Sequence, residues 1–248
     1  MNLQVAELAD AVALVLTADA KPSRVQRFEP HAPTVAYERV LRIQGYADLG
    51  RVRPAITAAA KAMARHAEAV CRSEVAYQFR AVRGLNADAI DLSCGGRLHC
   101  KAFATRLAGC IEVVPFVLTC GQPIAQSVID MADAGDLLEA LLLEAAGWLC
   151  IEDATRQFKS MLHRVTGERG CRITSRMGPG YAYHIDAQQV HWPLEDHPHL
   201  FALFGDASLP VELMSSCAMS PKLSRSGLYG VAPLHVSPPQ VGRPGPLN

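Results

Sequence analysis

The chain has 248 residues, of which 50% are hydrophobic, 24 are Lys or Arg and 24 are Asp or Glu. This length and apolar content are enough to bury a sizeable core in one domain. A net charge of zero and an aromatic content of 6% do not favour nucleic acid or an anionic membrane as the main partner. The apolar stretches 11–20 and 137–151 are short or carry glutamates, so we expect helices of a globular protein there and no membrane span.

In the first half of the chain, residues 1–32 are expected to be a loosely packed leader, followed by an extended arm over 31–46. Pro54 then starts an alanine-rich helix, because proline suits the first helical turn. The segment 73–82 is rich in β-formers and predicts a strand.

A second helix is expected over 101–109, ended by a glycine. The continuous apolar run 111–121, bounded by glycines, predicts a buried strand. Its Pro115 lacks an N–H group for the sheet, which predicts an edge position or a bulge.

Two helices follow, and the second begins at Asp136, where Asp136-x-x-Glu139 is typical of a capping box. Apolar residues recur at helical spacing for roughly 28 residues, which corresponds to about 42 Å of helix. This helix is expected to form the backbone of the fold, and the small residues 145–147 should let another element pack close to it.

After this helix the pattern favours β structure over 171–186 and a short helix over 197–205. Two short strands are expected over 209–221 and 226–233, joined by a polar turn from Lys222 to Ser226. The proline-rich tail 234–248 is expected to be disordered. The prediction is a single α+β domain over 33–233, with long helices packed against a twisted antiparallel or mixed sheet.

The eight cysteines are scattered along the chain and form no C-x-x-C pair: Cys71, Cys94, Cys100, Cys110, Cys120, Cys150, Cys171 and Cys217. Structural zinc and iron–sulfur clusters need tighter, paired spacings. We therefore expect free thiols in a reduced cytoplasm and no metal site. The segment 191–199 holds three histidines with Glu195 and Asp196, but its prolines prevent a regular helical ligand face.

The familiar catalytic motifs are absent from the sequence. It has no G-x-S-x-G, no G-x-x-x-x-G-K-[ST] and no histidine pair at H-x-x-x-H spacing. Two other segments carry unusual chemistry. The first, 176–181, places an arginine before a Gly-Pro-Gly turn and a tyrosine, and an arginine beside exposed backbone is suited to hold a carboxylate or phosphate. The second, 219–229, combines a proline, two cations and a Ser-Gly-x-Tyr end.

Together the two segments resemble the activation domain of cobalamin-dependent methionine synthase. That family carries an Arg-Pro-Ala-Pro-Gly-Tyr segment and, about forty residues later, a Met-x-Pro-x-x-x-x-Ser-Gly-x-Tyr segment. The matching positions here are Arg176, Pro179, Gly180 and Tyr181, then Met219, Pro221, Ser226, Gly227 and Tyr229. The match covers roughly 137–233, behind the long helix, and the sequence is similar to stand-alone, single-domain members.

The resemblance implies a domain that binds S-adenosylmethionine and supplies its methyl group when oxidised cobalamin is reductively remethylated. It implies that Arg176 holds the ligand carboxylate, that Gly178 and Gly180, which flank Pro179 after Met177, offer backbone to adenine, and that Tyr181 reaches the transfer site. Glu152, on the long helix, matches a glutamate that contacts the ligand.

The resemblance also implies partners. The first is a separately encoded cobalamin or corrinoid protein, for which a methionine synthase lacking its own activation domain is the main expectation. The second is a flavodoxin- or ferredoxin-type electron donor. The residues expected to dock on the cobalamin protein lie at the second segment: Lys222, Arg225, Ser226 and Tyr229.

Departures from the family pattern leave two alternatives open. Met177 replaces a proline, Gly178 an alanine, and His184 stands where the family has cysteine. One alternative is a non-catalytic docking module that does not use S-adenosylmethionine. The other is a small-molecule enzyme that uses His184 and Asp186 as an acid/base pair.

Overall fold

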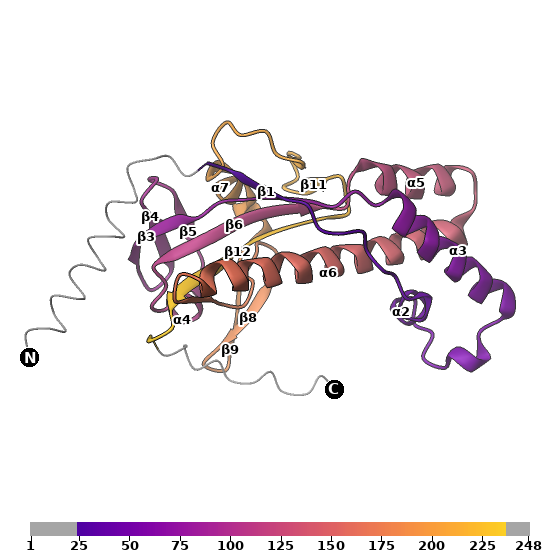
Figure 1. The fold of residues 1–248 in the computed structure, drawn as a ribbon, viewed down its shortest axis with the longest axis horizontal. Coiled ribbons are helices and arrows are strands. Elements are labelled where there is room, and N and C mark those ends of the chain that lie inside the picture. Colours follow the sequence, from indigo (N-terminus) through magenta and orange to yellow (C-terminus); the bar gives the residue numbers. More distant parts are fainter. Residues whose placement is uncertain (1–23, 237–248) are drawn as a thin grey trace, which may run out of the picture.

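The computed structural model describes residues 24–236 and shows an α+β fold built on a curled antiparallel sheet (Figure 1). The sheet has eight strands in the described residues, and its main path runs β1-β2-β6-β3-β4-β5. Strand β12 pairs with the other side of β6, and β7 pairs with β12. Its strands are β1 (Gln26–Phe28), β2 (Glu74–Tyr77), β3 (Arg80–Leu85), β4 (Ala89–Leu92), β5 (Arg97–His99), β6 (Glu112–Thr119), β7 (Cys171–Ile173) and β12 (Ser224–Pro233). The predicted fold class is confirmed.

Strand β6 is the centre of the sheet. It pairs with β12 along one side and with β2 and β3 along the other, so the edge position expected for Pro115 is wrong. The carbonyl of Pro115 accepts a hydrogen bond from the N–H of Gln78, so its N atom faces the same side, where β2 passes into β3. The missing N–H thus falls at a break in the sheet, and the predicted single strand 73–82 is divided there.

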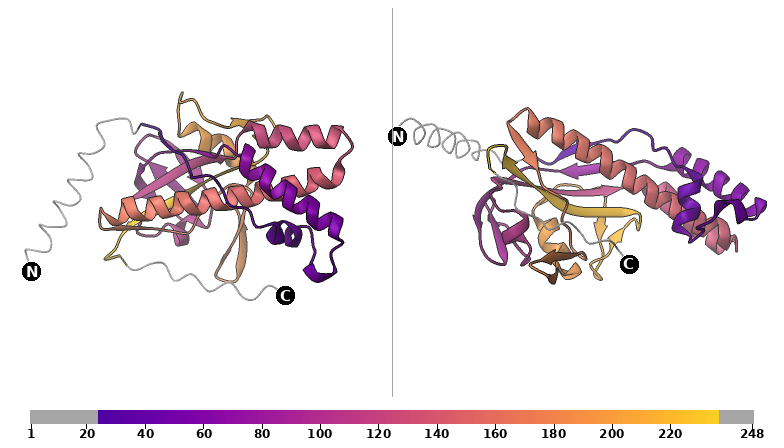
Figure 2. Two further views of the ribbon diagram at one scale, coloured as in Figure 1. Left: turned by 45° about the vertical axis from the view of Figure 1, so that its right-hand side comes forward. Right: turned by 90° about the horizontal axis from the view of Figure 1, so that it is seen from below.

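Helix α6 (Leu137–Gly167) has 31 residues and covers one face of the sheet (Figure 2). Phe116 of β6 and Tyr229 of β12 stack against each other, and both rings contact the ring of Phe158 on this helix. The N-cap residue Asp136 makes no side-chain capping bond, so the expected capping box does not form. Hydrophobic contact with the sheet therefore holds the helix in place.

Three further helices pack around the N-terminal half of α6 in Figure 1: α2 (Tyr37–Ile43), α3 (Pro54–Val70) and α5 (Gln122–Asp133). A short 3-10 turn, η2 (Leu49–Arg51), connects α2 to α3. The extended arm expected over 31–46 is wrong in its second half, because α2 turns Val40 and Leu41 into the core.

The small residues of α6 leave room for Leu223, which directly precedes β12. A Cβ atom on Gly147 would lie 2.4 Å from the end of the Leu223 side chain, so a larger residue there would require this leucine to shift. The predicted close approach at 145–147 is confirmed.

The opposite face of the sheet carries a second, smaller core that includes Phe103 and the fully buried Trp192. The elements on this side are α4 (Phe103–Arg106), β8 (Ala182–Ile185), β9 (Gln188–His191), η3 (Leu194–Asp196), α7 (His197–Ala202), β10 (Glu212–Leu213) and β11 (Met219–Ser220). Strands β8 and β9 form a hairpin that projects from the body (Figure 2). The single strand expected over 209–221 is instead the β10–β11 hairpin, and the polar turn expected over 222–226 is cut short because β12 begins at Ser224.

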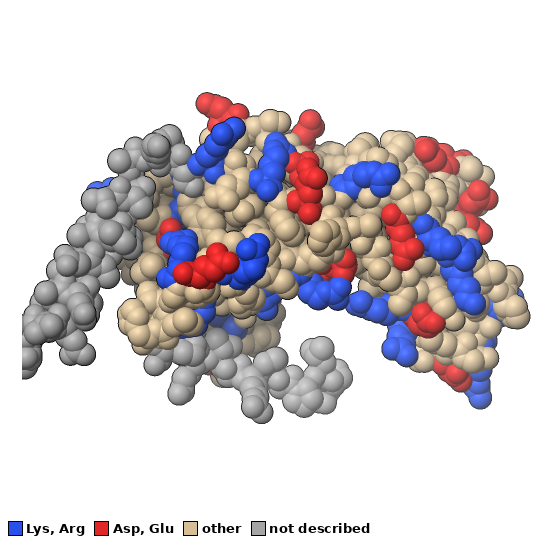
Figure 3. Space-filling view, in the orientation of Figure 1, with Lys and Arg blue, Asp and Glu red and all other residues tan. Residues whose placement is uncertain are grey.

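The described part of the expected leader is not loosely packed. Residues 26–28 form edge strand β1, paired with β2, and Phe28 packs against Phe158. Positions 1–23 and 237–248, which include most of the expected disordered tail, lie outside the described residues. Within the described range no helix combines the length and apolarity that a membrane crossing requires. Acidic and basic side chains are intermingled on the face drawn in Figure 3.

Candidate functional site

The two segments singled out in the sequence meet in the structure. The N–H of Met177 donates to the carbonyl of Leu228 at 2.9 Å, and the N–H of Leu228 donates to the carbonyl of Met177 at 2.7 Å. This antiparallel bridge fastens the 176–181 segment onto β12. Two segments about fifty residues apart in sequence are therefore joined by backbone hydrogen bonds.

Two glycines make this contact possible. Gly227 has φ of +148°, and a Cβ atom there would lie 2.1 Å from the carbonyl oxygen of Met177. On the other side, a Cβ atom on Gly178 would lie 2.9 Å from the carbonyl oxygen of Ser226. Glycine is required at both positions because the two backbones approach too closely for a side chain.

The hydroxyl of Tyr183 forms hydrogen bonds with both polar backbone groups of Gly178. It accepts from the Gly178 N–H at 2.7 Å and donates to the Gly178 carbonyl at 3.1 Å. The backbone that was expected to meet adenine is therefore already paired within the protein. Burial raises the pKa of Tyr183, so this hydroxyl stays protonated. Sequence reasoning missed Tyr183, although its spacing of five residues from Gly178 across a turn was a usable signal.

Arg176 is half-buried at the edge of this contact. Its Nη1 donates to the carbonyl of Ser226 at 3.3 Å, and its guanidinium carbon lies 4.4 Å from the centre of the Tyr181 ring. Tyr181 is 43% exposed, so the pair faces solvent. Met177, by contrast, buries its side chain in the second core, and only its backbone belongs to the site.

Glu152 faces the same region from α6. The guanidinium of Arg225 donates to it, and this hydrogen bond, with the charges of Arg225 and Arg176, lowers the pKa of Glu152. Glu152 is 55% exposed whereas Arg225 is only 10% exposed, because Arg225 also donates to Thr155 at 3.0 Å. The site therefore presents a carboxylate and a guanidinium to solvent, with a second guanidinium buried behind the carboxylate.

The residues expected to dock on a partner lie mostly inside the protein. Tyr229 is 1% exposed and stacks on Phe116, Ser226 is buried, and Arg225 is committed to Glu152. Only Lys222 keeps an exposed side chain, at 71%, paired with Glu144 at 2.6 Å. Strand β12 starts earlier than expected. Its side chains alternate between the two faces of the sheet, so Leu228 and Tyr229 enter different cores.

His197 is buried and bonds Ser226, the residue of β12 whose carbonyl Arg176 contacts. His197 was not assigned a role from sequence. Its Nδ1 lies 2.8 Å from the carbonyl of Cys217, so this nitrogen donates and Nε2 accepts from the Ser226 hydroxyl at 2.6 Å. Burial lowers the pKa of His197, which keeps the ring neutral. The pair fixes the backbone of β12 at the point where Arg176 binds it.

His184 and Asp186 do not form an enclosed acid/base pair. Both are exposed on the β8–β9 hairpin, and Asp186 sits in its turn with φ of 46°. Among the described residues, no group of three or more His, Cys, Asp or Glu side chains is arranged to hold a metal ion. Three hollows of about 350–370 Å³ are lined by residues other than Arg176, Glu152 and Tyr181.

The fold is similar to a solved structure described as the MetH reactivation domain bound to AdoHcy. The TM-score is 0.58, with 15% sequence identity, and the similarity covers 87% of this chain and 79% of that one. At this identity the likeness shows the fold alone. No family model and no curated protein sequence matches the chain.

Proposed function

We propose that the protein binds S-adenosylmethionine at Arg176 and Glu152 and supports reductive remethylation of cobalamin carried by another protein, such as a methionine synthase or a corrinoid protein. The observation that carries this proposal is the joining of the two motifs by the Met177–Leu228 bridge, with the charge of Arg176 near enough to Glu152 to help lower the pKa of that carboxylate. The fold likeness to the MetH reactivation domain, which was solved with AdoHcy, supports the same ligand class.

The chemistry of the ligand fits this charge pattern. S-adenosylmethionine carries a carboxylate, an ammonium group and a sulfonium. The guanidinium of Arg176 can hold the carboxylate, because planar N–H groups match carboxylate oxygens in pairs. The exposed oxygen of Glu152 can hold a cationic group, and its lowered pKa keeps it ionised at neutral pH. The ligand carboxylate would bind the N–H groups at the edge of the Arg176 guanidinium, because the Tyr181 ring lies against its face.

The glycines play a different part from the one the family resemblance implied. Gly178 serves the contact with β12, and Tyr183 already pairs its backbone. We therefore assign the adenine to the solvent side of the segment, beside Gly180 and Tyr181, and give Gly178 a positioning role. Tyr181 is exposed beside Arg176, which supports the proposal that it faces the cobalamin.

The methyl group would pass from the sulfonium to a reduced cobalamin, leaving S-adenosylhomocysteine, and the electron would come from a flavodoxin- or ferredoxin-type donor. The test uses the cobalamin-binding part of a methionine synthase in the cob(II)alamin state, with S-adenosylmethionine and a chemical reductant. We expect the absorbance spectrum to change to that of methylcobalamin faster when this protein is added. Equal rates with and without the protein would contradict the proposal.

The docking-module alternative shares the fold and differs in one property, since it predicts no binding of S-adenosylmethionine. The exposed carboxylate of Glu152 and the half-buried guanidinium of Arg176 favour the ligand-binding form, because a pure docking module has no need of these two charges. The acid/base alternative on His184 and Asp186 has no enclosed site on the described hairpin to support it.

A further inference from the structure

Three buried thiols meet away from the candidate site. Cys71 caps the C-terminus of α3, Cys120 directly follows β6, and Cys150 lies in the middle of α6. All three are free and buried. The Cys120 thiol donates to the carbonyl of Gly147, three residues before Cys150 on α6, at 3.8 Å. The Ser73 hydroxyl lies 3.3 Å from the sulfur of Cys71 and 3.8 Å from that of Cys120. Three elements distant in sequence thus place three thiols at one point.

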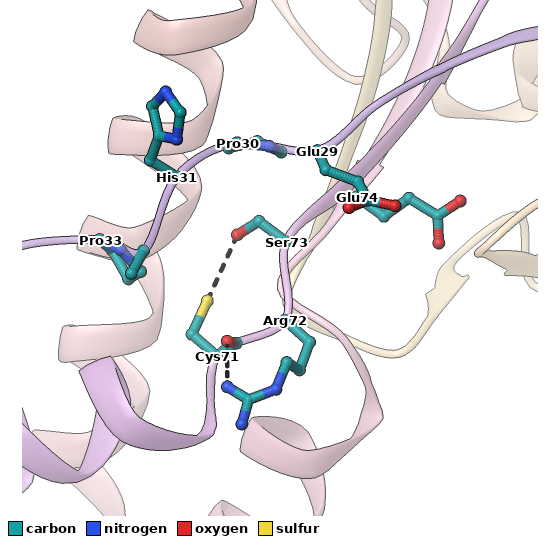
Figure 4. Close-up of a pocket in the computed structure, with 9 residues that line it drawn as sticks. Glu29, Pro30, His31, Pro33, Cys71, Arg72, Ser73 and Glu74 are labelled. Atoms are coloured by element: carbon teal, nitrogen blue, oxygen red, sulfur yellow. Dashed lines mark hydrogen bonds between the residues drawn. The ribbon is translucent and has the colours of Figure 1, made fainter.

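A hollow of about 370 Å³ opens above one of these thiols. Its walls are the arm 29–33 on one side and the segment 71–74 on the other, and Cys71 lines it with its sulfur directed toward Ser73 (Figure 4). The arm is held over the hollow by Gln157, whose side chain bonds both backbone groups of His31, at 2.8 and 3.3 Å. Cys120 and Cys150 do not line the hollow. A small molecule that enters it meets Cys71 first.

The surroundings distinguish Cys71 from the two thiols behind it. Hydrogen bonds with Cys120 and Cys150, together with the charge of Arg72, lower the pKa of Cys71. Hydrogen bonds with Cys120 and Cys71, together with burial, raise the pKa of Cys150. A thiolate is the nucleophile in thiol–disulfide exchange, and two protonated thiols next to it are ready to resolve a mixed disulfide.

We propose that Cys71 is a modification site that exchanges with a small disulfide such as oxidised glutathione, and that Cys120 or Cys150 then resolves it into an internal disulfide. In the first step the Cys71 sulfur attacks one sulfur of the small disulfide, which breaks its S–S bond and releases one thiol. In the second step a neighbouring cysteine loses its proton and attacks the Cys71 sulfur, releasing the second thiol. The two protein thiols are oxidised by two electrons, and the small disulfide is reduced to two thiols.

This site is separate from the proposed function and does not depend on it. A bond from Cys71 to Cys120 would join α3 to the end of β6, and a bond from Cys71 to Cys150 would join α3 to α6. Helix α6 also carries Glu152, two residues beyond Cys150, so the oxidised cluster would fix the helix from which Glu152 faces the candidate site.

The experiment treats the native, fully reduced chain with oxidised glutathione, blocks the remaining thiols with iodoacetamide, and maps the cysteines by mass spectrometry. We expect a disulfide that joins Cys71 to Cys120 or to Cys150. Before blocking, this product is about 2 Da lighter than the reduced chain, because two hydrogens leave. The Cys71→Ser variant should oxidise Cys120 and Cys150 at least about tenfold more slowly, because it lacks the entry thiol. The Cys94→Ser variant removes an exposed thiol and should leave the internal disulfide unchanged.

A second measurement needs no variant. Brief labelling of the wild-type chain with iodoacetamide should modify Cys71 before Cys120 and Cys150, and the labelling of Cys71 should persist below the pH at which ordinary thiols stop reacting. An internal disulfide that forms between Cys120 and Cys150 without Cys71, or Cys71 left reduced while exposed thiols exchange, would overturn the proposal.

Discussion

Replacement of Gly227 by alanine tests the joint between the two motifs. The new Cβ atom would lie 2.1 Å from the Met177 carbonyl oxygen, so the 176–181 segment must move off β12. Movement removes the two backbone hydrogen bonds between Met177 and Leu228, worth about 0.5–1.5 kcal/mol each. The positive φ adds about 1–2 kcal/mol for a residue with a side chain. We expect a loss of about 2–5 kcal/mol in the free energy of unfolding.

Gly135→Ala is the matched control. Gly135 also has positive φ, at +88°, but a Cβ atom there meets nothing within 4 Å. It should lose only the conformational cost of about 1–2 kcal/mol. Urea unfolding followed by circular dichroism gives both values, with the midpoint shift converted through the slope. If Gly227→Ala costs no more than Gly135→Ala, the two segments are not in the close contact described here.

Three further substitutions test individual contacts. Tyr183→Phe leaves the buried polar groups of Gly178 unpaired and should cost about 1–3 kcal/mol in the free energy of unfolding in urea. The control Tyr181→Phe changes an exposed residue and should stay within about 0.5 kcal/mol. Equal losses would show that Tyr183 does not hold Gly178. His197 has a folded-state pKa below its unfolded value of about 6.5, so its contribution to stability is present above that pH and is lost as the pH falls toward the folded pKa. His197→Gln should therefore lose less stability than the wild type between pH 7.5 and 5.5, by at most about 1.4 kcal/mol per pH unit. If the free energies of unfolding of the two proteins change in parallel with pH, the protonation of His197 does not differ between the folded and unfolded states. Lys222→Glu should slow association with a cobalamin-carrying partner and change its salt dependence, while unfolding shifts by less than about 0.5 kcal/mol; association rates unchanged at two ionic strengths would take Lys222 out of the interface.

Features that depend on neighbours along the chain were predicted well from sequence. The long helix was expected from Asp136 for roughly 28 residues and runs from Leu137 for 31. The buried strand expected over 111–121 is β6, and its apolar run is continuous because both faces are covered. The sequence also identified the two segments that form the candidate site.

Features that depend on distant partners could not be read from the same patterns. Edge strand β1 is too short to signal itself and exists because β2 offers it a partner. Arg225 looks like a surface cation in sequence and is buried because Glu152 and Thr155, about seventy residues away, receive it. The backbone of Gly178 was expected to meet adenine, whereas the fold packs it against Ser226 and Gly227 of β12.

Calorimetric titration of the full chain with S-adenosylmethionine tests the central claim most directly. We expect measurable binding to the wild type. Arg176→Ala should weaken it roughly ten- to a hundredfold, because a partly buried charged hydrogen bond contributes about 1.5–3 kcal/mol. Arg51→Ala, at an exposed arginine on the η2 turn, is the control and should bind like the wild type. No heat with the wild-type chain, or equal affinity in Arg176→Ala with its fold intact, would contradict the account.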